Sequence, residues 1–444
     1  MNKQLDTLRK VAGDLDQSFN KGSVLTFRFY EREMNFAYDA VVGVDERIYI
    51  AGSVIGRFAI AVLNQDGTFA NEFNGNGKLL DSFHGDERST GYRIKLVDGK
   101  IRLLGETDVS MEAGVRRCPA IASYHLNGQL DTAFGDGGYK VINPDFEAGV
   151  EFIHHYNDLH WSTHGNKTYV AAFRPYDLSV VVTCLNIHGQ VDPLFGVGGV
   201  ATIKHPRTAQ MALIRATDEG IYLAGSFSMG GVDRRAFCKL DLEGEMDLSF
   251  GTDGFVHDET PYSGVSALPQ HSSATLLGVG RNTNGSDEEG YIRYQGALVS
   301  LDQFGNPDKN FNDGAPVFTE IDFSTVWMTG AVQEDGVIVA LGSTGDPRPS
   351  APRTAPEQPE LKYVDHNKHD RAQERGLESY RFTVARFLRE GAIDTSFGRD
   401  HRGWITFNIN QGAEPMGIAV QSDHAIIVVG FTGDYSVFVC RFNG

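Results

Sequence analysis

The chain has 444 residues, of which 41% are hydrophobic and 22% charged, as in a folded soluble protein. Its formal net charge of −18 is spread along the chain, which excludes nucleic acid and anionic membrane as expected partners, because phosphate binding needs a basic face. The opening residues lack the apolar core of a secretory signal, and no apolar run is long enough to span a membrane. We therefore expect no membrane insertion, and a location in the cytoplasm or export without a cleaved signal peptide.

The four cysteines contain no Cys-x-x-Cys pair, so neither a zinc knuckle nor a thioredoxin-type site is indicated. We expect free thiols on strands rather than disulfides, and we expect no cofactor. The cysteines are Cys118, Cys184, Cys238 and Cys440.

The first element in the chain is the motif "GDLDQSFN", which begins at Gly13 and is followed by a predicted strand at 23–29. The pattern Gly-x-x-Asp-x-x-Phe-(Gly/Asn) then recurs, giving seven copies whose phenylalanines are separated by 54, 61, 61, 55, 61 and 86 residues. Such near-even repetition indicates scaffold rather than a site for one ion or one phosphate. The phenylalanines are Phe19, Phe73, Phe134, Phe195, Phe250, Phe311 and Phe397.

Between consecutive motifs the chain repeats one order of predicted strands. An apolar segment runs through a polar turn into a second strand, as at 93–106 and 214–226, where Asp-Gly or Glu-Gly favours a hairpin. A third strand leads into the motif, as at 58–67 and 180–189, and a more polar fourth strand follows it, as at 199–205. Four strands in about sixty residues, repeated seven times, predict a seven-bladed β-propeller with four antiparallel strands per blade.

The motif has a local physical explanation as the turn between the third and fourth strands. Its first Gly tolerates positive φ, its Asp accepts hydrogen bonds from backbone N–H groups farther along, and its Phe fills space between sheets. One copy lacks the Asp, at Ala70, and we expect looser turns where Asn replaces the second Gly. Those replacements are Asn20, Asn74 and Asn312.

The two ends of the chain predict how the ring closes. The chain begins with a motif and a fourth-type strand, and it ends on a third-type strand at 436–444. Strand 23–29 is therefore predicted to be the outermost strand of a blade whose other three strands come from about 415–442. This arrangement leaves no dangling sheet edge and makes residues 1–444 a single all-β propeller domain.

At these motifs and hairpins the sequence resembles the bacterial delta-sixty repeat family, from Gly13 to Gly444. The resemblance implies a propeller fold. It implies no shared catalytic residues, so no catalytic role is transferred to any position of this chain.

Departures from the repeat point to the face where function is expected. The connection between second and third strands is enlarged at 107–117 and 280–290, and most of all in the Pro-rich and charged insertion at 343–378. In a propeller this connection lies on the same face as the passages between blades. The long insertion is interpreted either as a solvated excursion or as an arm that contacts a partner.

The stretch "HHYNDLHWSTH" at 154–164 is the second departure, with four histidines, a Tyr and a Trp. His160 and His164 are four residues apart, but the stretch is predicted to enter an inner strand and no Glu follows His160, so no metal site is assigned. The two remaining interpretations are a lining for a polar ligand and ordinary packing. Trp327 is a similar candidate at the mouth of the central channel. The candidate ligand-binding residues are His154, His155, Tyr156, His160, Trp161 and Trp327.

No catalytic constellation is apparent, so the sequence favours a non-enzymatic binding protein that presents one propeller face to a protein or glycan. The alternative is an enzyme, a hydrolase or lyase, with polar residues from several inner strands converging at the central channel. A third hypothesis is a component of a secretion or toxin-antagonism system. Several histidines and carboxylates from different blades around one site would favour the enzyme.

Overall fold

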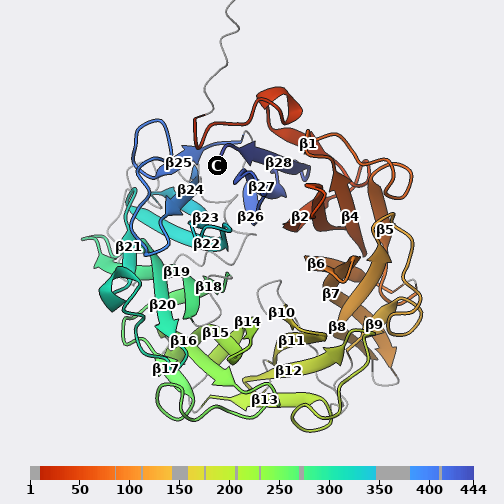
Figure 1. Cartoon of the computed structure of the whole chain (residues 1–444), viewed down its shortest axis with the longest axis horizontal. Coiled ribbons are helices and arrows are strands. Elements are labelled where there is room, and N and C mark those ends of the chain that lie inside the picture. Colours follow the sequence, from red (N-terminus) through yellow and green to blue (C-terminus); the bar gives the residue numbers. More distant parts are fainter. Residues whose placement is uncertain are drawn as a thin grey trace, which may run out of the picture.

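The computed structural model describes residues 11–85, 87–111, 114–142, 159–174, 177–205, 209–229, 232–269, 275–346, 381–409 and 413–444. Its strands form seven four-stranded sheets, arranged as blades around one axis (Figure 1). This confirms the predicted seven-bladed propeller. Two 3-10 turns also lie in these ranges, η1 (Asn20–Gly22) and η3 (Asn312–Gly314). Among these residues no helix is long and apolar enough to cross a membrane.

Each blade runs from an inner strand beside the axis to an outer strand at the rim. Blade 1 is β2 (Asn35–Val42), β3 (Ile48–Val54), β4 (Arg57–Leu63) and β5 (Lys78–Asp81); blade 2 is β6 (Ser89–Val97), β7 (Lys100–Met111), β8 (Gly114–His125) and β9 (Tyr139–Val141). Blade 3 is β10 (Leu159–His164), β11 (Lys167–Arg174), β12 (Ser179–Asn186) and β13 (Val200–Lys204); blade 4 is β14 (Ala209–Thr217), β15 (Gly220–Met229), β16 (Val232–Leu240) and β17 (Phe255–His257).

The remaining blades follow the same order. Blade 5 is β18 (Gly264–Ala267), β19 (Thr275–Ser286), β20 (Ile292–Asp302) and β21 (Val317–Thr319); blade 6 is β22 (Ser324–Val332), β23 (Ile338–Gly345), β24 (Arg381–Phe387) and β25 (Trp404–Phe407). Blade 7 is β26 (Glu414–Val420), β27 (Ile426–Phe431), β28 (Val437–Phe442) and, as its outer strand, β1 (Leu25–Phe27).

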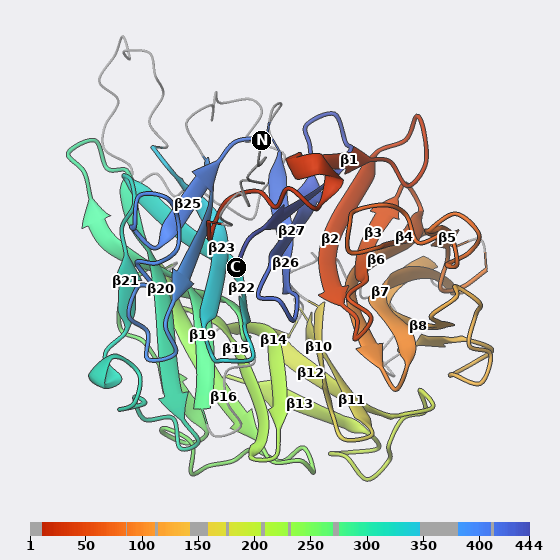
Figure 2. The same cartoon turned by 45° about the horizontal axis from the view of Figure 1, so that its top comes forward.

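Blade 7 closes the ring as the sequence predicts. Strand β1 pairs antiparallel with β28, with Thr26 opposite Phe438, and Figure 2 shows this first strand beside the C-terminal strands. The first motif completes the same blade, because Gly13 donates its backbone N–H to the Asn443 carbonyl at 2.9 Å. Pairing the first strand with the last blade removes the sheet edge that β28 would otherwise expose.

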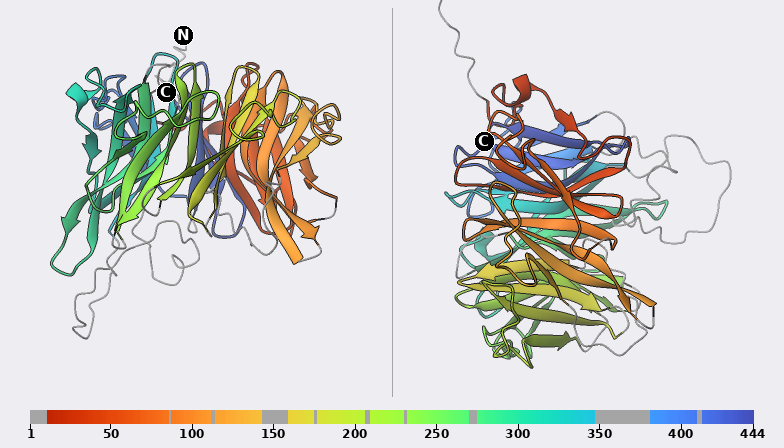
Figure 3. Two further views of the ribbon diagram at one scale, coloured as in Figure 1. Left: turned by 90° about the horizontal axis from the view of Figure 1, so that it is seen from below. Right: turned by 90° about the vertical axis from the view of Figure 1, so that its right-hand side faces the viewer.

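Strand order divides the disc into two faces, and Figure 3 shows the strands spanning the thickness between them. Turns from the first to the second strand of a blade, and the motifs from the third to the fourth, lie on one side, which we call the motif face. Turns from the second to the third strand, and the passages between blades, lie on the other side, which we call the top face.

The seven motifs form a closed ring of hydrogen bonds between blades, which we call the motif ring. In each motif the residue after the Phe donates its backbone N–H to the carbonyl just before the first Gly of the next motif, with N···O distances of 2.6–3.0 Å. The pairs are Asn20 to Asp66, Asn74 to Asn127, Gly135 to His188, Gly196 to Glu243, Gly251 to Phe304, Asn312 to Glu390 and Gly398 to Ala12. The motif is therefore the joint between neighbouring blades as well as a turn within one.

The first Gly of the motif is required for two reasons. All seven have positive φ, as the sequence predicts. In six of them a Cβ atom would also lie within 3.2 Å of the preceding motif's Phe ring, as at Gly189, where the nearest atoms of Phe134 would be 2.6 Å away. The phenylalanines are buried at no more than 2% exposure, which confirms their role as plugs between sheets.

The expectation of looser turns at Asn20, Asn74 and Asn312 is wrong. Each Asn has φ between 41° and 50° and makes the same bond in the motif ring as the glycines. Its side chain adds a hydrogen bond to a carbonyl four residues on, as from Asn74 Nδ2 to the Lys78 oxygen at 2.7 Å. Asn is among the residues that tolerate left-handed backbone, so it substitutes for Gly without loosening the turn.

The motif aspartates are turn caps, as predicted. Asp394 accepts the Ser396 N–H at 2.9 Å, and its other oxygen accepts Arg386 Nε from the third strand at 2.7 Å. Burial raises the pKa of Asp394, but the hydrogen bonds from Ser396 and the charge of Arg386 outweigh burial and lower the pKa overall. The corresponding Asp of the first motif, Asp16, also holds the third strand to the turn. It is buried and pairs with buried Arg441 on β28.

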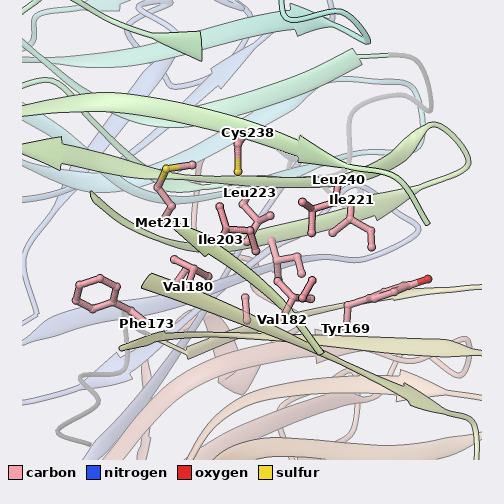
Figure 4. Close-up of a cluster of buried hydrophobic side chains, with 14 of the residues drawn as sticks. Tyr169, Phe173, Val180, Val182, Ile203, Met211, Ile221, Leu223, Cys238 and Leu240 are labelled. Carbon is pink, nitrogen blue, oxygen red and sulfur yellow. The ribbon is translucent and has the colours of Figure 1, made fainter. Parts of the chain in front are cut away.

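An apolar cluster fills the interface between each pair of neighbouring blades. Figure 4 shows the cluster between blades 3 and 4, which includes Tyr169, Val182, Met211, Leu223 and Cys238. All four cysteines are free and buried on strands, which confirms the prediction made from their spacing. Burial raises the pKa of each thiol, so these cysteines are packing residues.

Six of the seven inner strands carry a β-bulge opposite a Gly on the second strand. In blade 6 the register shifts between Trp327 and Thr329, and a Cβ on the facing Gly342 would lie 1.9 Å from the Val326 carbonyl oxygen. Blade 3 has Ala172 where the other blades have Gly, and its inner strand pairs without a shift. A bulge crowds the partner backbone, so the missing side chain makes room for it.

The two shorter insertions are longer strands rather than irregular loops. The segment at 107–117 extends the β7–β8 pair as far as Met111 opposite Gly114, and the segment at 280–290 extends the β19–β20 pair. Of the insertion at 343–378, residues 347–378 lie outside the described residues.

Candidate functional site

Charged and polar side chains gather on the inner strands of blades 1 to 4. Three of them occupy equivalent register positions just beyond the bulge site: Asp39 on β2, Arg93 on β6 and His160 on β10. Two residues farther along are Lys95, Ser162 and Arg215, on β6, β10 and β14. We call these six residues the inner ring; Ser162 is buried and the other five are half-buried.

Asp39 connects blade 1 to blade 2. Its Oδ2 accepts the Ile94 N–H at 3.0 Å, and its Oδ1 accepts the Ala40 N–H at 3.0 Å. Burial raises the pKa of Asp39, and this effect exceeds the lowering by the Arg93 charge and the two backbone hydrogen bonds. Asp39 is thus a structural carboxyl as well as the one acid of the inner ring.

Arg93 and His160 link blade 2 to blade 3. Arg93 Nη2 lies 3.4 Å from His160 Nε2. A guanidinium has only donors, so His160 Nε2 is the acceptor in this contact. Among the described residues no group of three or more His, Cys, Asp and Glu side chains is placed to hold a metal ion.

The predicted ligand-binding residues are only partly brought together. His160 and Trp161 are neighbours on β10, but Trp161 is 5% exposed and packs with Tyr92 and Leu104 of blade 2. Trp161 contacts one member of the inner ring: Lys95 Nζ lies over the face of its indole, 6.0 Å from the centroid. His154, His155 and Tyr156 lie outside the described residues.

Trp327 is not at the mouth of a central channel, where the sequence analysis placed it. Its side chain is completely buried between blades 5 and 6 and packs against the Phe387 ring, with 6.3 Å between centroids. Gly296 on β20 makes room for the indole, since a Cβ there would lie 2.2 Å from Trp327 Nε1. Trp327 is an interface plug and offers no surface to a ligand.

Aromatic side chains meet at the top face where blades 7, 1 and 2 adjoin. Phe36 is central: its ring centroid is 5.0 Å from that of Phe431, 5.6 Å from Tyr435 and 6.0 Å from Tyr38. Tyr38 in turn meets Tyr92 edge-on at 5.4 Å. We call these five residues the top aromatic cluster. Phe36, Tyr38 and Tyr435 are half-buried, so their rings are partly open to solvent.

A buried acid network lies beside this cluster. Tyr92 donates its hydroxyl to Glu106 Oε1 at 2.7 Å, and Arg117 Nη1 is 3.4 Å from the same oxygen. Burial raises the pKa of Glu106 to about 7, while the Tyr92 hydrogen bond and the Arg117 charge oppose the rise. Arg117 also donates from Nε to Asp108 at 3.0 Å, so the network fixes Tyr92, a buried member of the cluster.

The sequence analysis missed the inner ring and the top aromatic cluster. Aligning the seven inner strands on their hairpins would have shown charged residues at Arg93, Lys95 and Arg215 where blades 6 and 7 have Gly, Ala or Thr. No comparable signal marks the aromatic cluster, because Phe36 and Tyr435 come from opposite ends of the chain.

The inner ring differs from the arrangement that the enzyme alternative requires. Among its described members it holds one His and one carboxyl together with three cations, rather than several histidines and carboxylates around one site. The three cations are Arg93, Lys95 and Arg215.

No family model and no curated protein matches this chain. Among solved structures it is similar to a catalytically inactive virginiamycin B lyase from Staphylococcus aureus, with a TM-score of 0.46 and 9% identity over 95% of this chain and 99% of the other. It is also similar to Drosophila Semaphorin 2a, with a TM-score of 0.47 and 8% identity over 98% of this chain and 76% of the other. A third similar structure is the propeller domain of the Trilobed protease from Pyrococcus furiosus. Its TM-score is 0.42, with 8% identity over 92% of this chain and 93% of the other. Identities this low bear on the fold alone.

Proposed function

We propose that this propeller is a non-enzymatic binding protein that presents its top face to a protein or glycan partner. The observation that carries the proposal is the top aromatic cluster, in which Phe36, Tyr38 and Tyr435 are half-exposed on a rigid base. Aromatic side chains supply large contact areas at low entropic cost and dominate many interfaces.

The surroundings of the cluster support a contact surface. Tyr30 and Ile55, in neighbouring top-face turns, are 56% and 58% exposed, which adds apolar area around the rings. The turn that carries Tyr435 is held by Arg28, whose Nη2 donates to the Asp434 carbonyl at 2.7 Å. A surface already held in place loses little conformational entropy when a partner binds.

His154, His155 and Tyr156 stay within this proposal, because the passage into blade 3 belongs to the same face. We also infer from the recurring motif that the chain is related to the bacterial delta-sixty repeat proteins. A role in secretion or toxin antagonism would be one setting for such a binding protein.

The proposal is tested by replacing exposed rings of the cluster and screening for partners. Tyr38→Ala and Tyr435→Asn are suitable changes, since Tyr435 has a φ of 58° and Asn tolerates left-handed backbone. A glycan array identifies a sugar ligand, and stoichiometric co-purification identifies a protein. The double variant should bind the partner at least about tenfold more weakly, or about 1.4 kcal/mol.

A matched control removes apolar surface from the motif face. Leu248→Ala and Phe304→Ala change side chains that are 68% and 50% exposed, and both should leave binding unchanged. Circular dichroism and melting temperature check that every variant is folded. A blank result in both screens, or full binding by the folded double variant, contradicts the proposal.

A further inference from the structure

Two cations of the inner ring lie at matching register positions on inner strands beside the propeller axis. Lys95 and Arg215 hold equivalent positions on β6 and β14, the inner strands of the two blades that flank blade 3. Both are half-buried and so remain reachable from solvent. Ser162 occupies the same register position on β10, between them.

Neither cation has an acid partner among the described residues. No described carboxylate lies within 4.0 Å of the charged nitrogens of Lys95 or Arg215, and Arg215 Nε is buried without a hydrogen bond in this part of the chain. By contrast, cations on the third strands have acid partners: Lys239 pairs with Asp247 at 2.9 Å and Arg386 pairs with Asp394 at 2.7 Å. Charges that are enclosed are ordinarily paired.

The charge of Arg215 also disfavours the charged form of Lys95. The pKa of Lys95 is lowered to about 8, chiefly by burial; the Asp39 charge opposes this lowering, and the smaller effect of the Arg215 charge adds to it. Burial lowers the pKa of Arg215 to about 10. An anion placed between them would relieve both effects.

Neighbouring groups complete a site of defined chemistry. Ser162 Oγ accepts the Ala216 N–H at 2.9 Å, which leaves its hydroxyl proton to donate. The Trp161 ring lies 6.0 Å from Lys95 Nζ and holds the ammonium on that side. Arg93 adds a third positive charge two residues before Lys95 on the same strand, and Asp39 is the single acid of the inner ring.

We propose that Lys95 and Arg215, with the Ser162 hydroxyl, bind one small oxyanion, either a tetrahedral phosphate or sulfate or a carboxylate group. A guanidinium and an ammonium are the two side-chain cations that recognise such oxygens, the first in a planar fork and the second as a point charge. The site lies on the inner strands, and the proposal does not depend on the partner of the top face. The positive charge is local, in a chain whose formal net charge is −18.

The test is a titration of the full-length protein at pH 7 with inorganic phosphate, sulfate and acetate, at constant ionic strength. Calorimetry should show saturable binding at one site per chain for at least one of these anions, and sodium chloride should give none. Preference for phosphate or sulfate over acetate assigns a tetrahedral anion, and the reverse preference assigns a carboxylate.

Lys95→Met and Arg215→Met should each weaken binding at least about tenfold, and the double variant should abolish it. The matched control is Lys204→Met, which removes one positive charge from an exposed position on β13. Absence of saturable binding to the wild type, or equal binding by the double variant, overturns the proposal.

A pH series gives a readout that does not need the double variant to fold. Binding to the wild type should weaken as the pH rises through about 8, because Lys95 loses its charge there. Lys95→Arg should retain binding at higher pH. Asp39 and Arg215, which act on Lys95 electrostatically, are unchanged in both proteins. If both proteins follow the same pH profile, Lys95 does not bind the anion.

Discussion

The motif ring and the inner ring are built from copies of one repeat, but they have diverged to different extents. In the motif ring all seven copies keep the same interblade hydrogen bond, whether its donor is Gly or Asn. In the inner ring the positions of Asp39, Arg93 and His160 correspond to Ala267 in blade 5 and Thr329 in blade 6.

This difference separates two roles that a repeat protein must combine. Positions that join one blade to the next have the same task seven times, so the same residues recur. Positions beside the axis share no such common contact, even where Asp39 and Arg93 reach the next blade, so they can differ from blade to blade. In this chain charge is concentrated on the inner strands of blades 1 to 4, and small or apolar residues occupy the equivalent positions of blades 5 to 7. Variation among copies is thus the better guide to chemistry.

Removing the closing segment should have the largest effect on the motif ring. Deleting residues 1–30 takes away β1, buried Phe19 and Asp16, the partner of buried Arg441. Loss of a buried Phe and of a buried ion partner each costs about 3–5 kcal/mol, so the free energy of unfolding should fall by at least about 5 kcal/mol. Urea unfolding measures the loss.

Arg441→Met, made in both the full and the truncated chain, tests how much of this loss comes from the Asp16–Arg441 pair. In the full chain the change removes the buried partner of Asp16 and should cost about 3–5 kcal/mol. In the truncated chain Arg441 keeps only its contacts to Asp423 and Gln421, so the same change should cost less. A truncated protein that melts like the full chain would contradict the closure.

A single motif plug should matter nearly as much. Phe250→Ala removes a ring that is 0% exposed between blades 4 and 5, and we expect a loss of about 3–5 kcal/mol. Phe304→Ala on the same face changes a half-exposed ring and should stay within about 0.5 kcal/mol of wild type. Equal effects in chemical denaturation would show that the plug does not hold the interface.

Substitutions opposite the inner-strand bulge should affect stability differently in blade 3, which has no bulge, and in the other blades. Gly342→Ala places a Cβ 1.9 Å from the Val326 oxygen and should cost about 1–3 kcal/mol through overpacking. Ala172→Gly in blade 3, where no bulge is present, should cost only about 0.5–1 kcal/mol through lost backbone restriction. Thermal unfolding of the two variants compares them directly, and a tolerated Gly342→Ala would remove the steric explanation of the bulge.

The smallest effect is expected from the charge of Lys95. Its folded pKa of about 8 lies below its ordinary value of 10.5, so between these pH values the unfolded chain binds a proton that the folded chain does not. Stability of the wild type relative to Lys95→Met should therefore rise with pH across this window, by on the order of 1 kcal/mol once solvent screening of a half-buried group is allowed for. A difference that stays constant from pH 7 to 10.5 would mean that Lys95 is not perturbed.

The sequence by itself determined the fold of this protein to the level of single strands. Blade number, strand order, closure by strand 23–29 and the buried motif phenylalanines all followed from a repeated pattern. That was possible because the motif's chemistry is local: positive φ at one Gly, an Asp cap two residues from its donor, and a Phe at fixed spacing.

Only the tertiary structure decided which side chains meet. Arg93 meets His160 of the next blade, and Phe36 meets Tyr435 only because the ring closes. For Trp327, the position in the repeat predicted the channel mouth. The side chain is instead buried between blades, because Gly296 of the neighbouring blade leaves space for the indole. Contacts of this kind depend on the angle and register between separate sheets, and residue spacing along one strand does not encode them.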